Sequence, residues 1–183
     1  STSSVPGLKD ARFDEFERPF GSPDGRHWVI TAGSNRPTAE DEVIIVRRFG
    51  SDATLVAREG QPVPGGLPGE NWGLFDATLG INNNGDIAGG TNTSLAATDE
   101  IVFRQLANGD WAIPSREGSA VAGIPGATYG ATTNSISINS NASVNFLAAP
   151  LAGLPTTMDT QGLLNDGGSA AVREGDAAAP LAD

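Results

Sequence analysis

Short apolar runs separated by turn residues, and not a helical spacing, make up the hydrophobic pattern of this chain. In its middle third, four such runs cover residues 72–81, 86–91, 100–106 and 111–116. Asn84-Gly85 and Asn108-Gly109 stand between successive runs. Asn-Gly is typical of a tight β-hairpin, because both central residues of that turn need a positive φ. No window of helical length places its apolar residues on one helical face, so the pattern predicts an all-β protein.

The same order of runs occurs in the first third, at residues 13–20, 27–32, 43–48 and 54–58, and again, more weakly, in the last third, where 135–138 alternate. The tripeptide Arg-Glu-Gly marks the repeat. It occurs as Arg58-Glu59-Gly60, Arg116-Glu117-Gly118 and Arg173-Glu174-Gly175, so the arginines are separated by 58 and then 57 positions. Equal spacing over three copies is the signature of tandem structural units.

Two further landmarks keep this step. A turn signal follows the first run of each copy, as Ser22-Pro23-Asp24-Gly25, then 82–85 (NNNG) and 139–142 (NSNA). An acidic pair begins the third run as Asp41-Glu42 and Asp99-Glu100, and it is degraded to Asp159-Thr160 in the last copy. Landmarks that recur at both ends of each unit indicate that whole supersecondary units repeat.

These units predict three tandem four-stranded antiparallel sheets that resemble propeller blades. We expect one continuous β domain, divided into an N-terminal extended segment (1–12), repeat 1 (13–66), repeat 2 (67–124) and repeat 3 (125–183). A β-sandwich of three similar units is the main alternative. A β-solenoid is a third possibility, although its coils normally contain fewer residues.

A family resemblance rests on the turn and on the segment that ends each unit. Asn82 and Gly85 fit the pattern Asn-x-x-Gly, and a Pro/Gly-rich stretch follows Arg-Glu-Gly. In this the chain resembles bacterial tandem-repeat, propeller-like surface proteins of the choice-of-anchor type with an NxxGxxxF motif. The motif is incomplete, since Gly89 stands at its Phe position and Ala142 at the Gly position of the third copy. The resemblance implies a secreted or surface-attached protein and assigns no activity.

The charge narrows the range of partners. The chain carries 22 acidic and 11 basic residues, a formal net charge of −11, which disfavours binding to nucleic acid. No apolar run is long enough to span a bilayer. Cysteine is absent, so disulfides and thiolate metal sites are excluded. The start at Ser1 without an initiator Met agrees with removal of a signal peptide, and we expect an extracellular or cell-surface protein.

Candidate chemistry is sparse, and we predict no catalytic residue, no cofactor and no metal site. His27 is the single histidine, and its nearness to Ser22 and Asp24 in sequence does not make a catalytic triad. The segment 82–86 (NNNGD) lacks the alternating carboxylates of a calcium loop, so we interpret it as a hairpin turn. Asp41-Glu42 and Asp99-Glu100 are expected to be solvated charges at strand starts.

The remaining marked residues divide into structural and binding candidates. The three Arg-Glu-Gly copies, Asn82 and Gly85 are predicted to be structural, with the arginines in ion pairs between neighbouring sheets. Trp28, Trp72 and Trp111 are expected in the core, with a platform for glycans as the alternative.

The favoured functional hypothesis is assembly without catalysis. Three blades are too few to close a ring, so each end would lack a neighbour. The chain begins with Ser4-Val5-Pro6-Gly7, which resembles the connectors that follow Arg-Glu-Gly, and residues 119–158 carry no charge. We therefore expect head-to-tail self-association into a ring or filament, with residues 1–10 able to add a strand to a neighbour. The alternatives are a glycan- or ligand-binding module and, third, a metal-dependent hydrolase.

Overall fold

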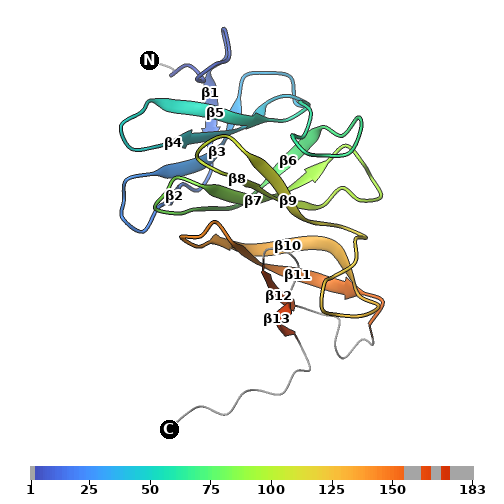
Figure 1. Ribbon diagram of the computed structural model, residues 1–183. Helices are drawn as coiled ribbons and strands as arrows, with labels where there is room; N and C mark the ends of the chain where they lie inside the picture. The colour runs from blue at the N-terminus through green and yellow to red at the C-terminus, as the bar shows by residue number, and fades with distance from the viewer. Residues whose placement is uncertain (1–2, 155–161, 166–169, 174–183) are drawn as a thin grey trace.

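Three antiparallel sheets follow one another in chain order in the computed structural model of this protein (Figure 1). The structure describes residues 3–154, 162–165 and 170–173, and within these residues it contains strands and turns without a helix. The all-β prediction is therefore confirmed. In the described part of the chain there is accordingly no helix that could cross a membrane.

Sheet 1 pairs its strands in the order β1-β3-β4-β5, with the short β2 also paired to β3. Its strands are β1 (Phe13–Phe16), β2 (Phe20–Gly21), β3 (Trp28–Ser34), β4 (Glu42–Arg47) and β5 (Ala53–Arg58). The sequence predicted one strand over 13–20, and the structure divides it in two. Pro19 lies in the break, and it has no backbone N–H to donate to a ladder.

Sheets 2 and 3 are four-stranded meanders. Sheet 2 consists of β6 (Trp72–Ile81), β7 (Ile87–Thr93), β8 (Ile101–Gln105) and β9 (Trp111–Arg116). Sheet 3 consists of β10 (Thr128–Ile138), β11 (Val144–Ala152), β12 (Gly162–Asn165) and β13 (Ala170–Arg173). β10 begins before the predicted 135–138, because the polar residues at its start pair with β11 although they show no apolar alternation.

Each sheet packs one face against the next sheet along the chain. Val29, Ile44 and Val46 of sheet 1 share a buried cluster with Ile87 and other apolar residues of sheet 2, among them Ile101 and Phe103. Alternate strand residues point to opposite faces. The other face of sheet 2, with Ala88 and Val102, packs against sheet 3, where Tyr129, Val144 and Phe146 are buried. The three sheets are thus joined by two cores of the same design.

A ladder of polar contacts joins the recurring turns at 22–25, 82–85 and 139–142, which precede β3, β7 and β11. The backbone N–H of Asp24 donates to Asn83 Oδ1 (3.0 Å), and Asn82 Nδ2 donates to the Asn139 carbonyl (2.8 Å). Asn84 Nδ2 donates in the same way to the Ser140 carbonyl (2.9 Å). The recurring Asn-rich turn therefore has a role beyond chain reversal, because it holds neighbouring sheets together.

Arginines of the preceding sheet complete this ladder. Arg48 Nε donates to the Gly85 carbonyl at 2.9 Å, and Arg104 donates to the Ala142 carbonyl at 2.7 Å. Gly85 and Ala142 occupy equivalent positions in the two turns, and both have a positive φ (82° and 60°). The hairpin predicted at Gly85 is confirmed by this geometry.

The connectors between sheets form a third repeated device, and the N-terminal segment adopts the same conformation. Val63 N–H donates to the Glu70 carbonyl (3.0 Å), and Val121 N–H donates to the Ala127 carbonyl (2.9 Å). Val5 N–H donates to the Ala11 carbonyl at 3.0 Å. Residues 3–12, predicted as an extended segment, thus form turns that are closed on themselves.

Candidate functional site

The candidate functional site is the outer face of sheet 1, the face turned away from sheet 2. It is formed by the side chains of Trp28, Ile30, Ala32, Val43, Ile45, Ala53 and Leu55. The strand pairings make Val43 and Ile45 equivalent to Ile101 and Phe103, which are the sheet 2 residues that pack against sheet 1. The outer face is therefore the surface that, one repeat later, is buried under another sheet.

The N-terminal segment covers part of this outer face. Val5 and Ala11 are buried there against Ala32, Val43 and Ile45, and Leu8 is half-buried beside them. This segment therefore packs on its own sheet 1, so the structure shows no free strand in residues 3–12 for addition to a neighbour. On the equivalent face of sheet 2, the connector residue Val63 lies in one buried cluster with apolar residues of sheet 1. A connector and a neighbouring sheet can therefore cover a face of this kind together.

The covering is incomplete. Phe13, Trp28, Ile30 and Leu55 keep intermediate exposure on the outer face. Phe16, at 61% exposure, extends this surface, because its ring lies 4.9 Å from that of Phe13. Several apolar side chains in one area mark an interaction surface more often than isolated ones do.

The three tryptophans do not form one platform. Trp72 is buried and its ring lies 5.5 Å from that of Trp111, and both contact Phe103 in the core between sheets 1 and 2. Trp28 lies on the opposite face of sheet 1. A stacked sugar needs an exposed ring face, which Trp72 does not offer.

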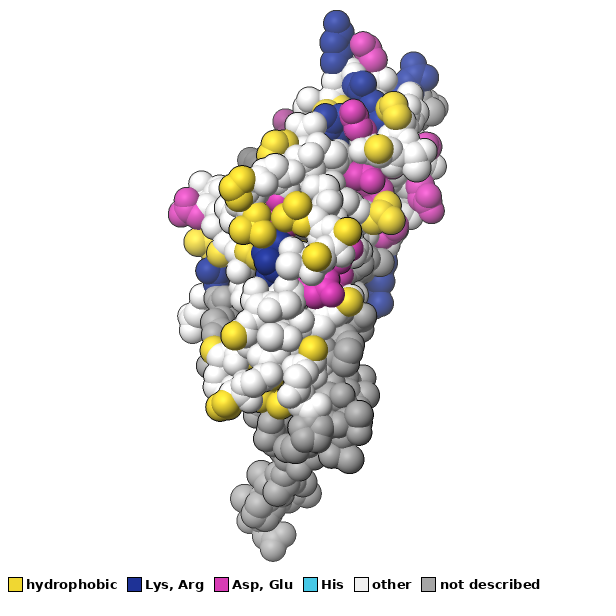
Figure 2. Space-filling model, turned by 90° about the vertical axis from the view of Figure 1, so that its right-hand side faces the viewer, with side chains coloured by type: hydrophobic (Ala, Val, Ile, Leu, Met, Phe, Trp, Pro, Cys, Tyr) yellow, Lys and Arg dark blue, Asp and Glu magenta, His cyan; other side chains and the backbone are white. Residues whose placement is uncertain are grey.

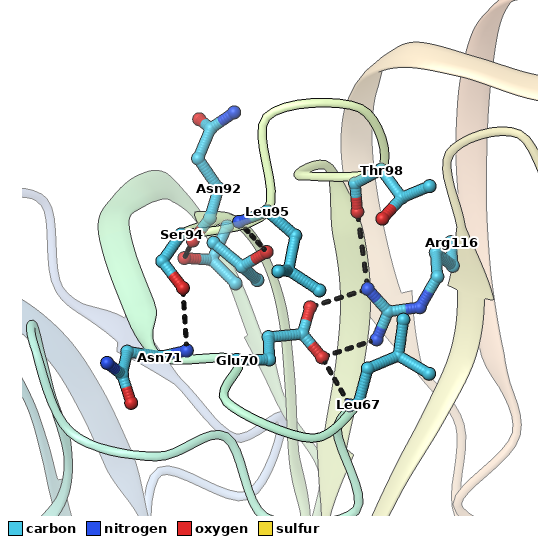
Figure 3. A network of polar contacts seen from close by, with 10 residues as sticks. Leu67, Glu70, Asn71, Asn92, Ser94, Leu95, Thr98 and Arg116 are labelled. Atoms are coloured by element: carbon cyan, nitrogen blue, oxygen red, sulfur yellow. Dashed lines mark hydrogen bonds and ion pairs between the residues drawn. The ribbon is translucent and has the colours of Figure 1, made fainter.

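Arg58 and Arg116 each pair within their own repeat, so the prediction of ion pairs between neighbouring sheets is wrong for these two arginines. Arg116, at the end of β9, binds Glu70 of the connector with two hydrogen bonds, one of them 2.7 Å long from Nη2 to Oε2 (Figure 3). Arg58 instead pairs with Glu40 at 2.9 Å. The side chain of Arg173 and residues Glu174 and Gly175 lie outside what the structure describes.

Glu70 is the centre of a wider network. Its Oε2 also accepts the Leu67 N–H (2.7 Å), and Arg116 donates to the Thr98 carbonyl (3.2 Å) (Figure 3). Burial alone would raise the pKa of Glu70, but the hydrogen bonds from Arg116, Leu67 and Thr93 outweigh it and keep that pKa below its usual value. The network fixes the connector against the edge strand of sheet 2.

The glutamates of the tripeptide have acidic neighbours. Burial, together with the adjacent Asp41 carboxyl, raises the pKa of Glu59. Burial and Asp99 raise the pKa of Glu117 in the same way. The recurring Asp-Glu pairs at the strand starts, expected to be separate solvated charges, therefore lie beside a second acidic residue of the same repeat. Gly60 and Gly118 follow with φ of 76° and 75°, which favours glycine.

His27, Ser22 and Asp24 lie near one another in sequence but make separate contacts. His27 Nδ1 accepts the Phe49 N–H (3.1 Å), while the Ser22 hydroxyl donates to Asp24 (2.6 Å), so the three side chains do not form a relay. Within the described ranges no three Asp, Glu, His or Cys residues are grouped as a metal site would require.

One comparison with known proteins covers the whole chain: residues 1–183 match a family described as "Family of unknown function (DUF7453)". The chain belongs to this family. No curated protein and no solved structure matches it significantly. In this DUF7453 member the outer face of sheet 1 combines a buried apolar cluster with half-buried aromatic and aliphatic side chains at its margin.

Proposed function

We propose that this protein is a non-enzymatic assembly protein, in which the outer face of sheet 1 binds sheet 3 of a second copy. The supporting observation is that the equivalent face of sheet 2 is buried under sheet 1, with the connector residue Val63 in the same cluster. A head-to-tail contact of this type would repeat an arrangement that the chain already uses. Such contacts close into rings or continue as filaments, depending on the rotation between copies.

We further infer that the sheets are arranged as blades of an open propeller. The meander order of sheets 2 and 3 supports this, as does the position of β6, which lies next to both β3 and β10. An extracellular or cell-surface location belongs to the same proposal and rests on the resemblance to surface repeat proteins.

Sedimentation velocity over a range of protein concentrations tests the proposal. We expect species larger than the monomer, and we expect Phe16→Ser to shift the distribution towards monomer because it removes an apolar ring from the interface. Phe49→Ser is the matched control, since Phe49 is 68% exposed but lies in the β4–β5 turn, where its ring stacks with Arg26. A wild-type protein that stays monomeric up to about 100 µM, above most physiological affinities, would refute self-association.

A further inference from the structure

Residues 3–13 repeat the hydrogen bonds of the two connectors that join the sheets. Each connector is closed by a bond from the N–H of an aromatic residue to the carbonyl of the first connector residue. This bond occurs in three places: Trp72 to Gln61 (2.8 Å), Tyr129 to Ser119 (2.9 Å) and Phe13 to Ser3 (3.2 Å). Gln61 and Ser119 directly follow Arg-Glu-Gly in the sequence. Ser3 therefore occupies the position that, in the other repeats, comes directly after the preceding sheet.

The turn inside each connector is repeated as well. A valine carbonyl accepts the N–H three residues later: Leu8 to Val5 (3.2 Å), Gly66 to Val63 (3.0 Å) and Ile124 to Val121 (3.3 Å). A glycine with a positive φ lies before each donor, as Gly7 (75°), Gly65 (75°) and Gly123 (81°). This position of a tight turn favours glycine. Residues 3–12 thus form a complete connector within a single copy of the chain.

The aromatic residue that closes each connector differs in what covers it. Trp72 is 3% exposed and lies in one cluster with Ile44 of the preceding sheet 1. Tyr129 is 5% exposed and lies in one cluster with Val102 of the preceding sheet 2. Phe13 keeps intermediate exposure, because sheet 1 is the first sheet of the chain. Phe13 is therefore an aromatic side chain at a position that the two later repeats bury.

The two ends of the chain differ in charge. Residues 1–12 contain two basic residues, the exposed Lys9 and Arg12, and one acidic residue. Figure 2 shows Lys and Arg side chains at the upper end of the molecule, where this segment lies, and almost no charge on the described surface of the lower part. The last ten residues, 174–183, contain three acidic residues and no Lys or Arg. Opposite charges favour an encounter between the end of one copy and the beginning of another.

We propose that residues 3–12 of one copy act as the connector to sheet 3 of a second copy, with Ser3 next to Gly175 of that copy and Phe13 buried between the two. This inference rests on the proposed head-to-tail contact and specifies where the copies join. The segment is already folded on its own sheet, so binding costs little additional ordering.

The register of the connectors specifies the junction further. Two glycines of Arg-Glu-Gly donate their N–H groups to the carbonyls of the closing aromatic residues, Gly60 to Trp72 and Gly118 to Tyr129, both at 2.8 Å. In the same register, Gly175 of the second copy donates to the Phe13 carbonyl. Ser1 and Thr2 stand in the sequence where repeat 1 has Glu59-Gly60, so they yield this place to the second copy.

Cross-linking at the junction tests the proposal, and introduced cysteines are unique because the chain contains none. Ser3→Cys with Asp176→Cys, treated with a short bismaleimide, should give a ladder of covalent dimers and larger species. Each single variant should remain monomeric after the same treatment. Ser3→Cys with Asp52→Cys is the matched control, since Asp52 is exposed in the turn between β4 and β5, and it should give no ladder.

Variants of Phe13 test the buried anchor by sedimentation velocity. Phe13→Ala should weaken association about tenfold or more, the loss typical of an aromatic residue at the centre of an interface. Phe13→Trp and Phe13→Tyr should retain it, because repeats 2 and 3 have Trp72 and Tyr129 at this position. Phe49→Ala, in the β4–β5 turn, should leave it unchanged. Circular dichroism of each variant shows whether the monomer is folded.

The outcomes separate this inference from the proposed function. Wild-type oligomers together with no ladder from Ser3→Cys/Asp176→Cys would overturn the connector role and leave self-association standing. The connector role is also overturned by a ladder from the Asp52→Cys control, or by unchanged association of a folded Phe13→Ala. Dimers from Ser3→Cys alone would mean that two outer faces meet, which contradicts both proposals, as does a wild type that stays monomeric.

Discussion

Neutralising Glu70 while keeping its shape, as Glu70→Gln, probes how much the connector depends on its ion pair. The Glu70 side chain is fully buried, and that of Arg116 is 13% exposed. Removing one member of a buried pair leaves an uncompensated charge and typically costs about 3–5 kcal/mol. Gln can still accept one hydrogen bond and Arg116 keeps some contact with water. We therefore expect a loss of about 3 kcal/mol in the free energy of unfolding.

Repeat 1 provides the matched control. Arg58 occupies the position equivalent to Arg116, but its partner Glu40 is 48% exposed. Exposed pairs contribute about 1 kcal/mol or less, so Glu40→Gln should have little effect. Urea denaturation followed by tryptophan fluorescence measures both variants, because Trp72 and Trp111 lie in sheet 2 and report on the sheet that Glu70 supports.

A double variant and a pH series sharpen the test. If an uncompensated Arg116 causes the loss, adding Arg116→Gln to Glu70→Gln should cost little more. The pKa of Glu70 is lowered in the folded state, so its stabilisation is present above the usual glutamate pKa and is lost as the pH falls through the lowered value. Equal losses for Glu70→Gln and Glu40→Gln would refute the reasoning.

Two further predictions concern the turns and the acidic pairs. Ala142→Gly should stabilise the protein by about 1 kcal/mol, because Ala142 has a φ of 60° where repeat 2 has Gly85. Gly85→Ala should destabilise it. Thermal unfolding measures both variants, and a loss of stability in Ala142→Gly would contradict the argument. Glu59→Gln should stabilise the protein at pH 7. Because the pKa of Glu59 is raised in the folded protein, Glu59 contributes to the stability of the wild type below the usual glutamate pKa. This contribution is lost as the pH rises through the raised value. In urea titrations the advantage of this variant should therefore disappear below about pH 4, and an advantage that persists there would count against the assignment.

The parts of the fold that sequence could predict are those coded by neighbouring residues. β6 begins and ends at the predicted residues because Trp72 to Ile81 is bounded by a connector and by an Asn-Gly turn. Gly85 specified the turn by its need for a positive φ. Both signals act over a few residues, so they are readable without knowing what packs against them.

The partners of the charged side chains could not be predicted from neighbouring residues alone. Arg58 and Arg116 stand in identical tripeptides, yet their partners differ because the connector before sheet 2 carries Glu70 where the N-terminal segment has Ala11. Glu42 of β4 accepts the Phe75 N–H of β6 at 2.7 Å, a contact between two sheets that no local pattern in the sequence marks. Only the bend of each sheet and the packing between sheets bring these groups together.

The uncharged stretch from 119 to 158 suggested an interface between copies, and the structure gives much of it a role within the chain. Val121, Ile124 and Tyr129 are buried in the core between sheets 2 and 3, and so are Val144 and Phe146. Lack of charge there is required by folding alone, so it adds no independent support for assembly. The outer face of sheet 1 is a different case. Its half-buried Trp28 and Ile30, like the exposed Phe16, contribute apolar surface that the fold leaves open. A buried equivalent of that surface exists one repeat later, and the proposed self-association therefore depends on this face.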